Sequence, residues 1–335
     1  MAEYKGVLIF AEATKGRLSP ITAELLGCGK KLADSLEEEL SAVILGDGIT
    51  GLSQEAIAFG ADKVYIVDSP ILKDYQTDPY VMFMEKVVKQ VKPRILLLGQ
   101  TTIGRDLAPR SAFRLGTVAT TDCIELSIDR SSKKLLQTKA VYGGNIMATF
   151  TSNSYPQIAT VRAKAYSPLK PDTSRQGKVV AVDAEVEPSA VRTKVINKVS
   201  ETAKGVRLED SAVIVAGGRG IGSAEGFKEL EELANLLNGV VGATRPPCDN
   251  GWVQDSAQIG LTGKIVAPDL YIAIALSGSS QHISGFSGAK NIIAINKDPE
   301  ANIFKIARFG IVGDWKKVLP AFTDKVREFV STSSF

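Results

Sequence analysis

The chain has 335 residues, and its 40 Lys and Arg residues nearly balance its 37 Asp and Glu residues, which leaves a formal net charge of +3. At about 150 residues per domain this length predicts two domains, and the balanced charge argues against a dedicated nucleic-acid-binding protein. The three cysteines lie far apart and His282 is the single histidine. This chain alone therefore cannot build a four-cysteine zinc site, a ferredoxin-type cluster or a multi-histidine metal site.

No stretch of the sequence is long and apolar enough to cross a membrane. The longest uncharged apolar run, residues 270–276, is far shorter than the ~20 residues that a spanning helix needs. The apolar run at 7–11 is too short for the core of a signal peptide, and the N-terminus is not an Arg-rich transit peptide. We therefore expect a cytoplasmic protein whose first strand starts the fold directly.

The first half alternates short apolar runs with segments of helical periodicity. We expect strands at 4–10, 41–45, 63–67 and 94–98 and helices at 19–40, 54–59, 79–91 and 105–115. Strands separated by helices pair in parallel, and runs that are apolar throughout are typical of a sheet buried on both faces. After Thr117 the pattern changes to strands without helices, which predicts an added mixed or antiparallel section. Those strands are expected at 122–126, 134–138, 145–150 and 157–162.

The second half restarts the alternation after a segment rich in proline and serine. Residues 167–204 are interpreted as a linker with one peripheral strand at 179–182, which places the boundary near Gly205 and the domains at 1–204 and 205–335. We expect strands at 212–216, 271–276, 291–295 and 309–312 and helices at 223–238, near 281 and at 314–330. The predicted fold class is α/β, with two domains that each hold a mostly parallel sheet with helices on both faces (Rossmann-like).

Small polar residues follow the expected strands of the second half, where an open α/β sheet binds its ligands. The run 217–222 is GGRGIG, which predicts either a phosphate-binding loop before a helix or a plain turn. Arg219 favours phosphate, although it can equally be a solvated loop charge. The loops 241–247 and 258–264 each carry small residues and one cation, and each is either a ligand loop or a surface turn.

His282 follows the expected strand at 271–276, beside Ser277 and Gln281. A lone histidine is commonly structural, but this one is not on an apolar helical face and has no serine or cysteine nucleophile arranged around it. Ligand electrostatics is therefore favoured over covalent catalysis, and no catalytic residue is predicted. In the first half, the loops at 47–48 and 99–106 predict either a nucleotide cleft or buried hydrogen-bonding turns.

Several long motifs occur in one family's order. They are YIAIALSGSSQHISGFSGAKNIIAIN at 271–296, GGRGIGS at 217–223, GATRPPCDNGW at 242–252 and QIGLTGKIVAPDLY at 258–271. The first half adds VLIFAE, GQTTIGRDLAPR and YGGN. These motifs resemble the alpha subunits of electron transfer flavoproteins (the FixB family). The resemblance covers nearly the whole chain and is least distinctive at 167–204.

The resemblance implies an electron carrier rather than an enzyme that converts a substrate. The C-terminal domain would hold one FAD, and the N-terminal domain would pack on a beta subunit in a heterodimer. The beta subunit would hold AMP or a second FAD. Electrons would pass one at a time from an acyl-CoA dehydrogenase or related flavoenzyme of fatty acid β-oxidation to a membrane quinone oxidoreductase.

By matching positions, the resemblance implies residues for four parts of FAD. The pyrophosphate would be held by Arg219, Ser277 and Gly278. The isoalloxazine would lie against Thr244, Arg245 and the surrounding loop of Gln258, Ile259, Gly260, Thr262 and Gly263. The pyrimidine side of the ring would face Gln281 and His282, and the adenosine end would contact Asn296 and Asp314. A His282 donor there, with Arg245 over the ring, would stabilise the negative charge that the reduced flavin gains, by roughly 1.5–3 kcal/mol per charge-assisted hydrogen bond.

The sequence departs from the family pattern at a few positions. Ala275 and Leu276 stand where Gly-Ile is usual, Ser280 replaces a β-branched apolar residue, Thr244 stands where serine is frequent, and Leu261 replaces a glutamine and is left out of the site. These departures indicate a divergent branch with different potentials or partners.

Three alternatives stay open at this stage. One is a subunit of a flavoprotein that bifurcates electrons from NADH with a second FAD in the beta subunit. The second is an NAD-dependent enzyme of sirtuin-like fold, although the zinc cysteines of that class are missing. The third is a regulatory nucleotide-binding module that acts only through partner contacts.

Overall fold

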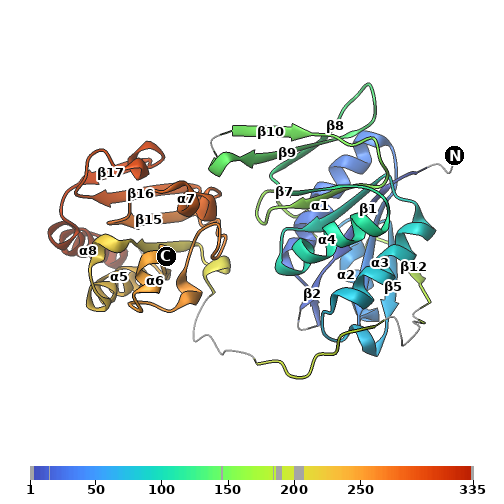
Figure 1. The fold of residues 1–335 in the computed structure, drawn as a ribbon, viewed down its shortest axis with the longest axis horizontal. Helices are drawn as coiled ribbons and strands as arrows, with labels where there is room; N and C mark the ends of the chain where they lie inside the picture. Colours follow the sequence, from blue (N-terminus) through green and yellow to red (C-terminus); the bar gives the residue numbers. More distant parts are fainter. Residues whose placement is uncertain are drawn as a thin grey trace. The chain divides into compact units, whose positions relative to one another are not determined.

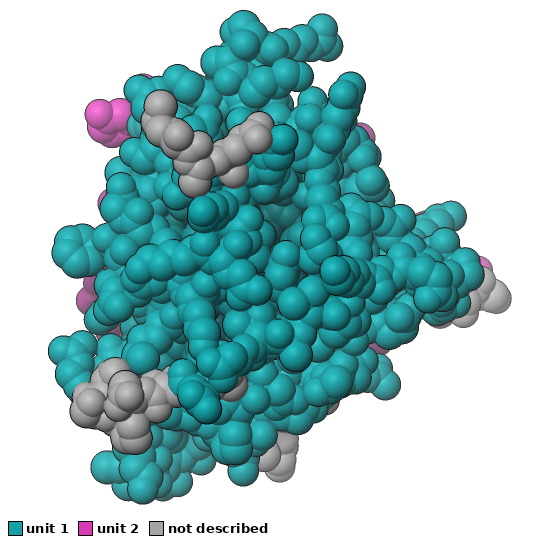
Figure 2. Space-filling model, turned by 90° about the vertical axis from the view of Figure 1, so that its right-hand side faces the viewer, with its two compact units in different colours: residues 1–141, 147–199 teal, residues 142–146, 200–335 magenta. Residues whose placement is uncertain are grey.

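The computed structural model describes residues 4–14, 16–144, 146–183, 185, 191–199 and 207–332. The chain forms two compact units (Figure 1). Unit 1 comprises residues 1–141 and 147–199, and unit 2 comprises residues 142–146 and 200–335. Figure 2 shows the surface of unit 1 in teal. The expected boundary near Gly205 lies outside the described residues.

Unit 1 is built on a seven-stranded sheet in the order β12-β5-β4-β1-β6-β11-β7. Every neighbouring pair in it is parallel. The strands are β1 (Val7–Ala11), β4 (Leu40–Gly46), β5 (Lys63–Asp68), β6 (Ile95–Gly99), β7 (Ala119–Cys123), β11 (Gln157–Val161) and β12 (Lys178–Ala181). The helices are α1 (Pro20–Leu36), α2 (Ser53–Ala58), α3 (Thr77–Val91) and α4 (Thr102–Arg114).

Both faces of this sheet are buried, because alternate residues of each strand enter two separate cores. In β1, Val7 and Ile9 pack with α1 and α2, whereas Leu8 and Phe10 pack with α3 and α4. All five residues of β1 are buried, which explains why this strand is apolar throughout rather than alternating. The expected doubly wound parallel sheet is confirmed.

The added section after α4 divides between two sheets. The strands β11 and β7 join the main sheet in parallel, with an irregular register between Ala159 and Val161. The strands β8 (Glu125–Ile128), β9 (Leu135–Val141) and β10 (Ile146–Phe150) form a separate three-stranded sheet, in which β8 and β9 are antiparallel. A small antiparallel ribbon pairs β2 (Ala13–Thr14) with β3 (Arg17–Leu18).

Unit 2 is built on a five-stranded, fully parallel sheet in the order β14-β13-β15-β16-β17. Its strands are β13 (Val213–Gly217), β14 (Val240–Ala243), β15 (Leu270–Ile274), β16 (Asn291–Asn296) and β17 (Phe309–Val312). Its helices are α5 (Ala224–Leu236), α6 (Arg245–Asp249), α7 (Ser280–Phe286) and α8 (Trp315–Thr332). One core packs the sheet on α5 and α8, and a second packs it on α7.

Two elements of unit 2 differ from expectation, because β14 and α6 replace the loop predicted at 241–247. Strand β14 is short and contains Gly242, whose missing side chain makes room for Ile259: a Cβ there would stand 2.4 Å from Cδ1 of Ile259. Helix α6 carries proline in its first turn. Proline is tolerated there because N–H groups in the first turn have no hydrogen-bond acceptor within the helix.

Candidate functional site

The strand order of unit 2 creates a switch point beside β13. This strand lies between β14 and β15, so the helices that follow it and its neighbour leave on different faces, and ligands of doubly wound sheets bind outside the strand ends at such a point. The loop after β13 holds a short 3-10 turn, Arg219–Ile221, before α5. The loop after β15 runs through Ala275 to Ser279.

The glycines of the first loop serve mainly to pack it against the second. The amides of Gly218 and Gly220 donate to the carbonyl oxygens of Ile274 and Ala275 at 3.0 and 3.2 Å. A Cβ on Gly218 would stand 2.4 Å from the Ala275 oxygen, and a Cβ on Gly220 would stand 2.8 Å from it. Gly222 differs, with φ +91° and open space around it. The expected close approach of glycine to a ligand is therefore a contact between two loops at Gly218 and Gly220.

A cavity of about 270 Å³ opens at the carboxyl ends of these strands. It is lined by Gly220, Ala275, Asn296, Lys297, Gly313, Asp314, Trp315 and Lys316. Two predicted site residues, Asn296 at the end of β16 and Asp314 after β17, thus share one pocket with the glycine loop. Arg219 stands exposed in the same loop, and no carboxylate of the described residues pairs with its guanidinium.

The side chains of Asn296 and Asp314 also hold the ends of this pocket together. The Asn296 amide donates to the Leu276 carbonyl at 2.8 Å, and its oxygen accepts from the Asp298 amide at 3.0 Å. A carboxylate oxygen of Asp314 accepts from the Lys316 amide at 3.1 Å in the first turn of α8. Asp314 keeps an exposed carboxylate, whereas Asn296 is partly buried.

The second cluster of predicted residues begins after β14. The Thr244 amide donates to the Gly217 carbonyl at 3.0 Å, and its hydroxyl makes no hydrogen bond to the start of α6. Arg245 is exposed, and its Nε lies 3.2 Å from a carboxylate oxygen of Asp249 one turn later. Because this pair is solvent-exposed, it costs little to break when another anion competes for the guanidinium.

The loop 258–264 folds on itself and joins β14 to α7. The Ile259 amide donates to the Ala243 carbonyl at 2.9 Å, and the Leu261 amide donates to the Gln281 carbonyl at 2.8 Å. Within the loop, the Gln258 amide group donates to the Thr262 hydroxyl at 3.0 Å. Internal backbone bonds join the remaining residues, Gly260, Gly263 and Lys264. The predicted residues Gln258–Gly263 and Gln281 are therefore joined by hydrogen bonds into one unit, in which Ile259 and Gly260 are buried.

Ser277 and Gly278 shape the loop after β15. Gly278 has φ +74°, and a Cβ there would stand 2.5 Å from the amide nitrogen of Ile303. The Ser277 carbonyl accepts from that same amide at 3.1 Å, while Ser277 itself is exposed. Only glycine fits the Gly278 position, and Ser277 stays exposed beyond the end of the strand.

His282 is held inside the protein, at 4% exposure. Its Nδ1 lies 2.8 Å from the Ile259 carbonyl oxygen, and its Nε2 lies 2.9 Å from the Tyr271 hydroxyl. Burial lowers the pKa of His282 to about 4, against the weaker opposite effect of the Ile259 hydrogen bond. The ring is neutral at pH 7 and both nitrogens have protein partners. In this geometry neither ring nitrogen is left to donate to a ligand.

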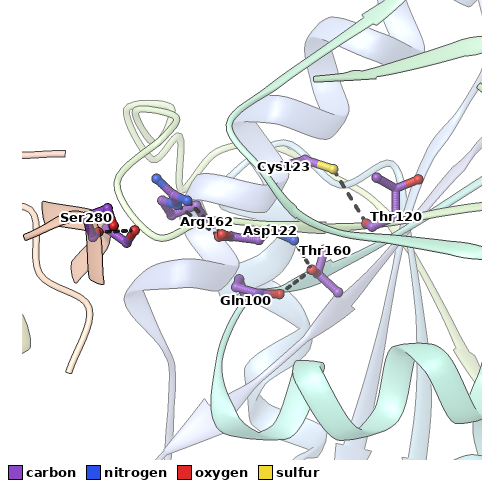
Figure 3. A network of polar contacts seen from close by, with 8 residues as sticks. Gln100, Thr120, Asp122, Cys123, Thr160, Arg162 and Ser280 are labelled. Carbon is purple, nitrogen blue, oxygen red and sulfur yellow. Dashed lines mark hydrogen bonds and ion pairs between the residues drawn. The ribbon is translucent and has the colours of Figure 1, made fainter. Parts of the chain in front are cut away.

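The loops of unit 1 are tied by hydrogen bonds. Figure 3 shows the Thr160 hydroxyl bonded to Gln100 and to the Asp122 amide, and Arg162 paired with the Asp122 carboxylate at 2.7 Å. Thr101 caps α4 and donates to Glu12 at 2.7 Å, where burial raises the pKa of Glu12 to about 7. The loop at 47–48 is also held by a hydrogen bond, which the Gly48 amide donates to the Asp68 carboxylate at 2.8 Å. These contacts favour the hydrogen-bonding interpretation of loops 47–48 and 99–106.

Two residues that the sequence interpretation missed hold the site in place. Tyr271 is fully buried in β15 and binds His282, and Trp315 is 6% exposed and donates to the Gly220 carbonyl. Tyr271 was taken as an ordinary strand residue. The available signal was that Tyr and Trp, with one polar atom each, need a hydrogen-bond partner when buried.

Unit 2 thus belongs to the class of doubly wound α/β folds, with a cavity of about 270 Å³ at the carboxyl ends of its strands. Residues 7–187 match the family described as "Electron transfer flavoprotein domain", and residues 207–287 match "Electron transfer flavoprotein FAD-binding domain". The chain belongs to the electron transfer flavoprotein alpha subunit family, which confirms the resemblance and replaces the sirtuin-like and regulatory alternatives.

Full-length relatives agree with this membership. The chain is 45% identical to "Electron transfer flavoprotein subunit alpha" of Thermoanaerobacterium thermosaccharolyticum, covering 98% of this chain and 99% of the relative. It is 42% identical to the protein of the same name from Megasphaera elsdenii, covering 98% of each chain. It is 41% identical to "Protein FixB" of Clostridium saccharobutylicum, covering 99% of each chain. In the part of the chain that the structure describes, no helix is long and apolar enough to span a bilayer.

Proposed function

We propose that this chain is the alpha subunit of a heterodimeric electron transfer flavoprotein, that it binds one FAD in unit 2, and that it carries electrons singly between flavoenzymes. The family match supports a role in electron transfer, and the match of residues 207–287 to an FAD-binding domain supports FAD as the cofactor. The observation that supports the proposal most is that Asn296 and Asp314 line one cavity with Gly220, whose loop also carries Arg219.

The residues present fit the chemistry of FAD. The cavity of about 270 Å³ suits one end of a dinucleotide, and it offers an amide, a carboxylate and two lysines at its rim: Asn296, Asp314, Lys297 and Lys316. Gly222 leaves open space before α5, whose N-terminus favours anions. Arg219, in the same loop, supplies a positive charge for a pyrophosphate.

We propose the same part of FAD for each group of residues as the resemblance implies. Arg219, Ser277 and Gly278 would hold the pyrophosphate, and Asn296 and Asp314 the adenosine end. The isoalloxazine would lie against the surface made by Thr244, Arg245, the Gln258–Gly263 loop and Gln281. Bound FAD supplies the one-electron chemistry.

His282 enters this proposal as a support for the loop rather than as a charged donor. Its neutral ring joins Ile259 to Tyr271 and so orients the loop that would face the isoalloxazine. The positive charge near the ring then comes from Arg245, whose contact with Asp249 is exposed and weak. Arg245 can thus turn toward negative charge at low cost.

The partners belong to the proposal as well. Family membership implies a beta subunit, and we propose that it holds AMP when the complex transfers electrons from an acyl-CoA dehydrogenase-type flavoenzyme to a quinone oxidoreductase. A second FAD in the beta subunit would instead indicate electron bifurcation from NADH.

Co-expression with the beta subunit and a count of bound cofactors test the proposal. We expect a yellow heterodimer with one FAD per complex, released as FAD on denaturation, together with AMP. Two FAD molecules per heterodimer would favour the bifurcating alternative. A complex that stays colourless after incubation with FAD would overturn the proposed function.

A further inference from the structure

Trp315 links three segments of unit 2. It opens α8, and its indole Nε1–H donates to the carbonyl oxygen of Gly220 at 3.0 Å. The far edge of the ring packs against the first turn of α5, where a Cβ on Gly226 would stand 3.1 Å from Cη2 of Trp315. One side chain therefore ties the start of α8 to the glycine loop after β13 and to the helix that follows it.

The segments that Trp315 joins border the same cavity. Gly220 and Trp315 both line the pocket of about 270 Å³, and Asp314 precedes the tryptophan directly. The Gly220 amide is fixed from the other side, because it donates to the Ala275 carbonyl at 3.2 Å. With the Gly220 carbonyl fixed by the indole and its amide by Ala275, the backbone that carries Arg219 has one orientation.

We propose that Trp315 is a positioning residue for the nucleotide half of the cofactor, acting through the Gly220 carbonyl on the loop that presents Arg219. The inference rests on the proposed function and extends it to a residue outside the predicted set. An apolar ring of similar size would fill the space but would leave the Gly220 carbonyl without its indole donor, so the loop would lose one of the two hydrogen bonds that orient it.

The test compares heterodimers that differ only at one tryptophan of this chain. We measure dissociation constants for FAD and for FMN, which lacks the adenosine half, and amide hydrogen exchange across 218–226. Trp315→Phe is expected to weaken FAD binding about three- to tenfold, the worth of one hydrogen bond. FMN keeps only one phosphate for Arg219 to hold, so its binding should weaken less, and exchange in the glycine loop should be faster. Trp252→Phe makes the same chemical change at the other tryptophan and should alter none of these.

Two results would overturn this proposal. Equal FAD affinity in Trp315→Phe and wild type overturns it, as does a parallel loss of FAD and FMN affinity, because a purely structural role would weaken both. If Trp315→Phe does not fold, Trp315→Leu takes its place with the same expected split between FAD and FMN. A wild-type complex that binds no FAD overturns the proposed function itself, which distinguishes that failure from this one.

Discussion

The hydroxyl of Tyr271 in β15 lies 2.9 Å from Nε2 of His282 in α7, and the other ring nitrogen lies 2.8 Å from the carbonyl oxygen of Ile259. Burial raises the pKa of Tyr271 well above its usual value, so the hydroxyl keeps its proton. The Ile259 carbonyl only accepts, which leaves Nδ1 as the donor and Nε2 as the acceptor. His282 is therefore a neutral clamp between the sheet and the loop 258–264.

Tyr271→Phe removes the donor of this clamp and leaves a buried ring nitrogen without a partner. We expect unit 2 to lose about 1–3 kcal/mol of stability, the usual cost of an unpaired buried polar group. Urea unfolding, monitored by amide hydrogen exchange in each unit, measures this loss of stability. Tyr80→Phe is the matched control, because Tyr80 is buried and donates to the Leu72 carbonyl at 3.0 Å in unit 1. Unit 2 exchange as slow in Tyr271→Phe as in wild type would contradict the clamp.

The buried histidine also predicts a pH dependence. The pKa of His282 is about 4 in the folded chain against an ordinary 6.5, so the unfolded chain takes up the proton at higher pH. Stability is fully present above about pH 6.5 and declines as the pH falls toward 4, by roughly 3 kcal/mol in total. Urea midpoints between pH 7 and pH 4.5 measure the decline, and His282→Gln should flatten it. Because His282 is the single histidine of the chain, an imidazole NMR titration near pH 6.5 would refute the low pKa.

The fold was predictable where local pattern decides it and not where distant pairing does. Apolar runs between helical segments suffice to predict both parallel sheets. The positions of β7 and β11 depend instead on pairing across the sheet, which no local pattern encodes. The sequence did not predict strand β14, because a short run that contains glycine is typical of a turn. In the fold, Gly242 is needed in this strand to make room for Ile259.

The site was predictable by the same logic. Loops at strand ends can be located from the strands alone, so Arg219, Ser277, Asn296 and Asp314 fall at one edge of the sheet. Which atoms those loops satisfy depends on contacts between segments far apart in sequence. The partners of His282 come from β15 and the loop 258–264, and no local pattern around the histidine encodes them.

Ala275 occupies a backbone conformation that favours glycine. Its φ is +50°, and its Cβ would be 3.0 Å from a Cβ added to Gly220. A left-handed conformation costs an alanine about 1–2 kcal/mol, whereas a glycine loses about 0.4–1 kcal/mol more chain freedom when the protein folds. Ala275→Gly should therefore stabilise unit 2 by about 0.5–1 kcal/mol in urea unfolding. Ala294→Gly, within β16 and outside the left-handed region, should destabilise it instead. A destabilised Ala275→Gly chain would show that the alanine is not strained.

Arg219 tests the anion site most directly. Among the described residues no carboxylate pairs with its guanidinium, so its charge is available to a pyrophosphate, where a charged hydrogen bond contributes about 1.5 kcal/mol or more. Arg219→Ala should release FAD about tenfold more readily on dilution, and the difference should shrink at high salt as the exposed charge is screened. Arg219→Lys, which keeps the charge but not the planar fork, should fall between the two.

Arg327→Ala is the control, because Arg327 lies on α8 and pairs with Asp324 at 2.6 Å, away from the cavity lining. FAD retention that is equal in Arg219→Ala and wild type would mean that the glycine loop does not hold the pyrophosphate.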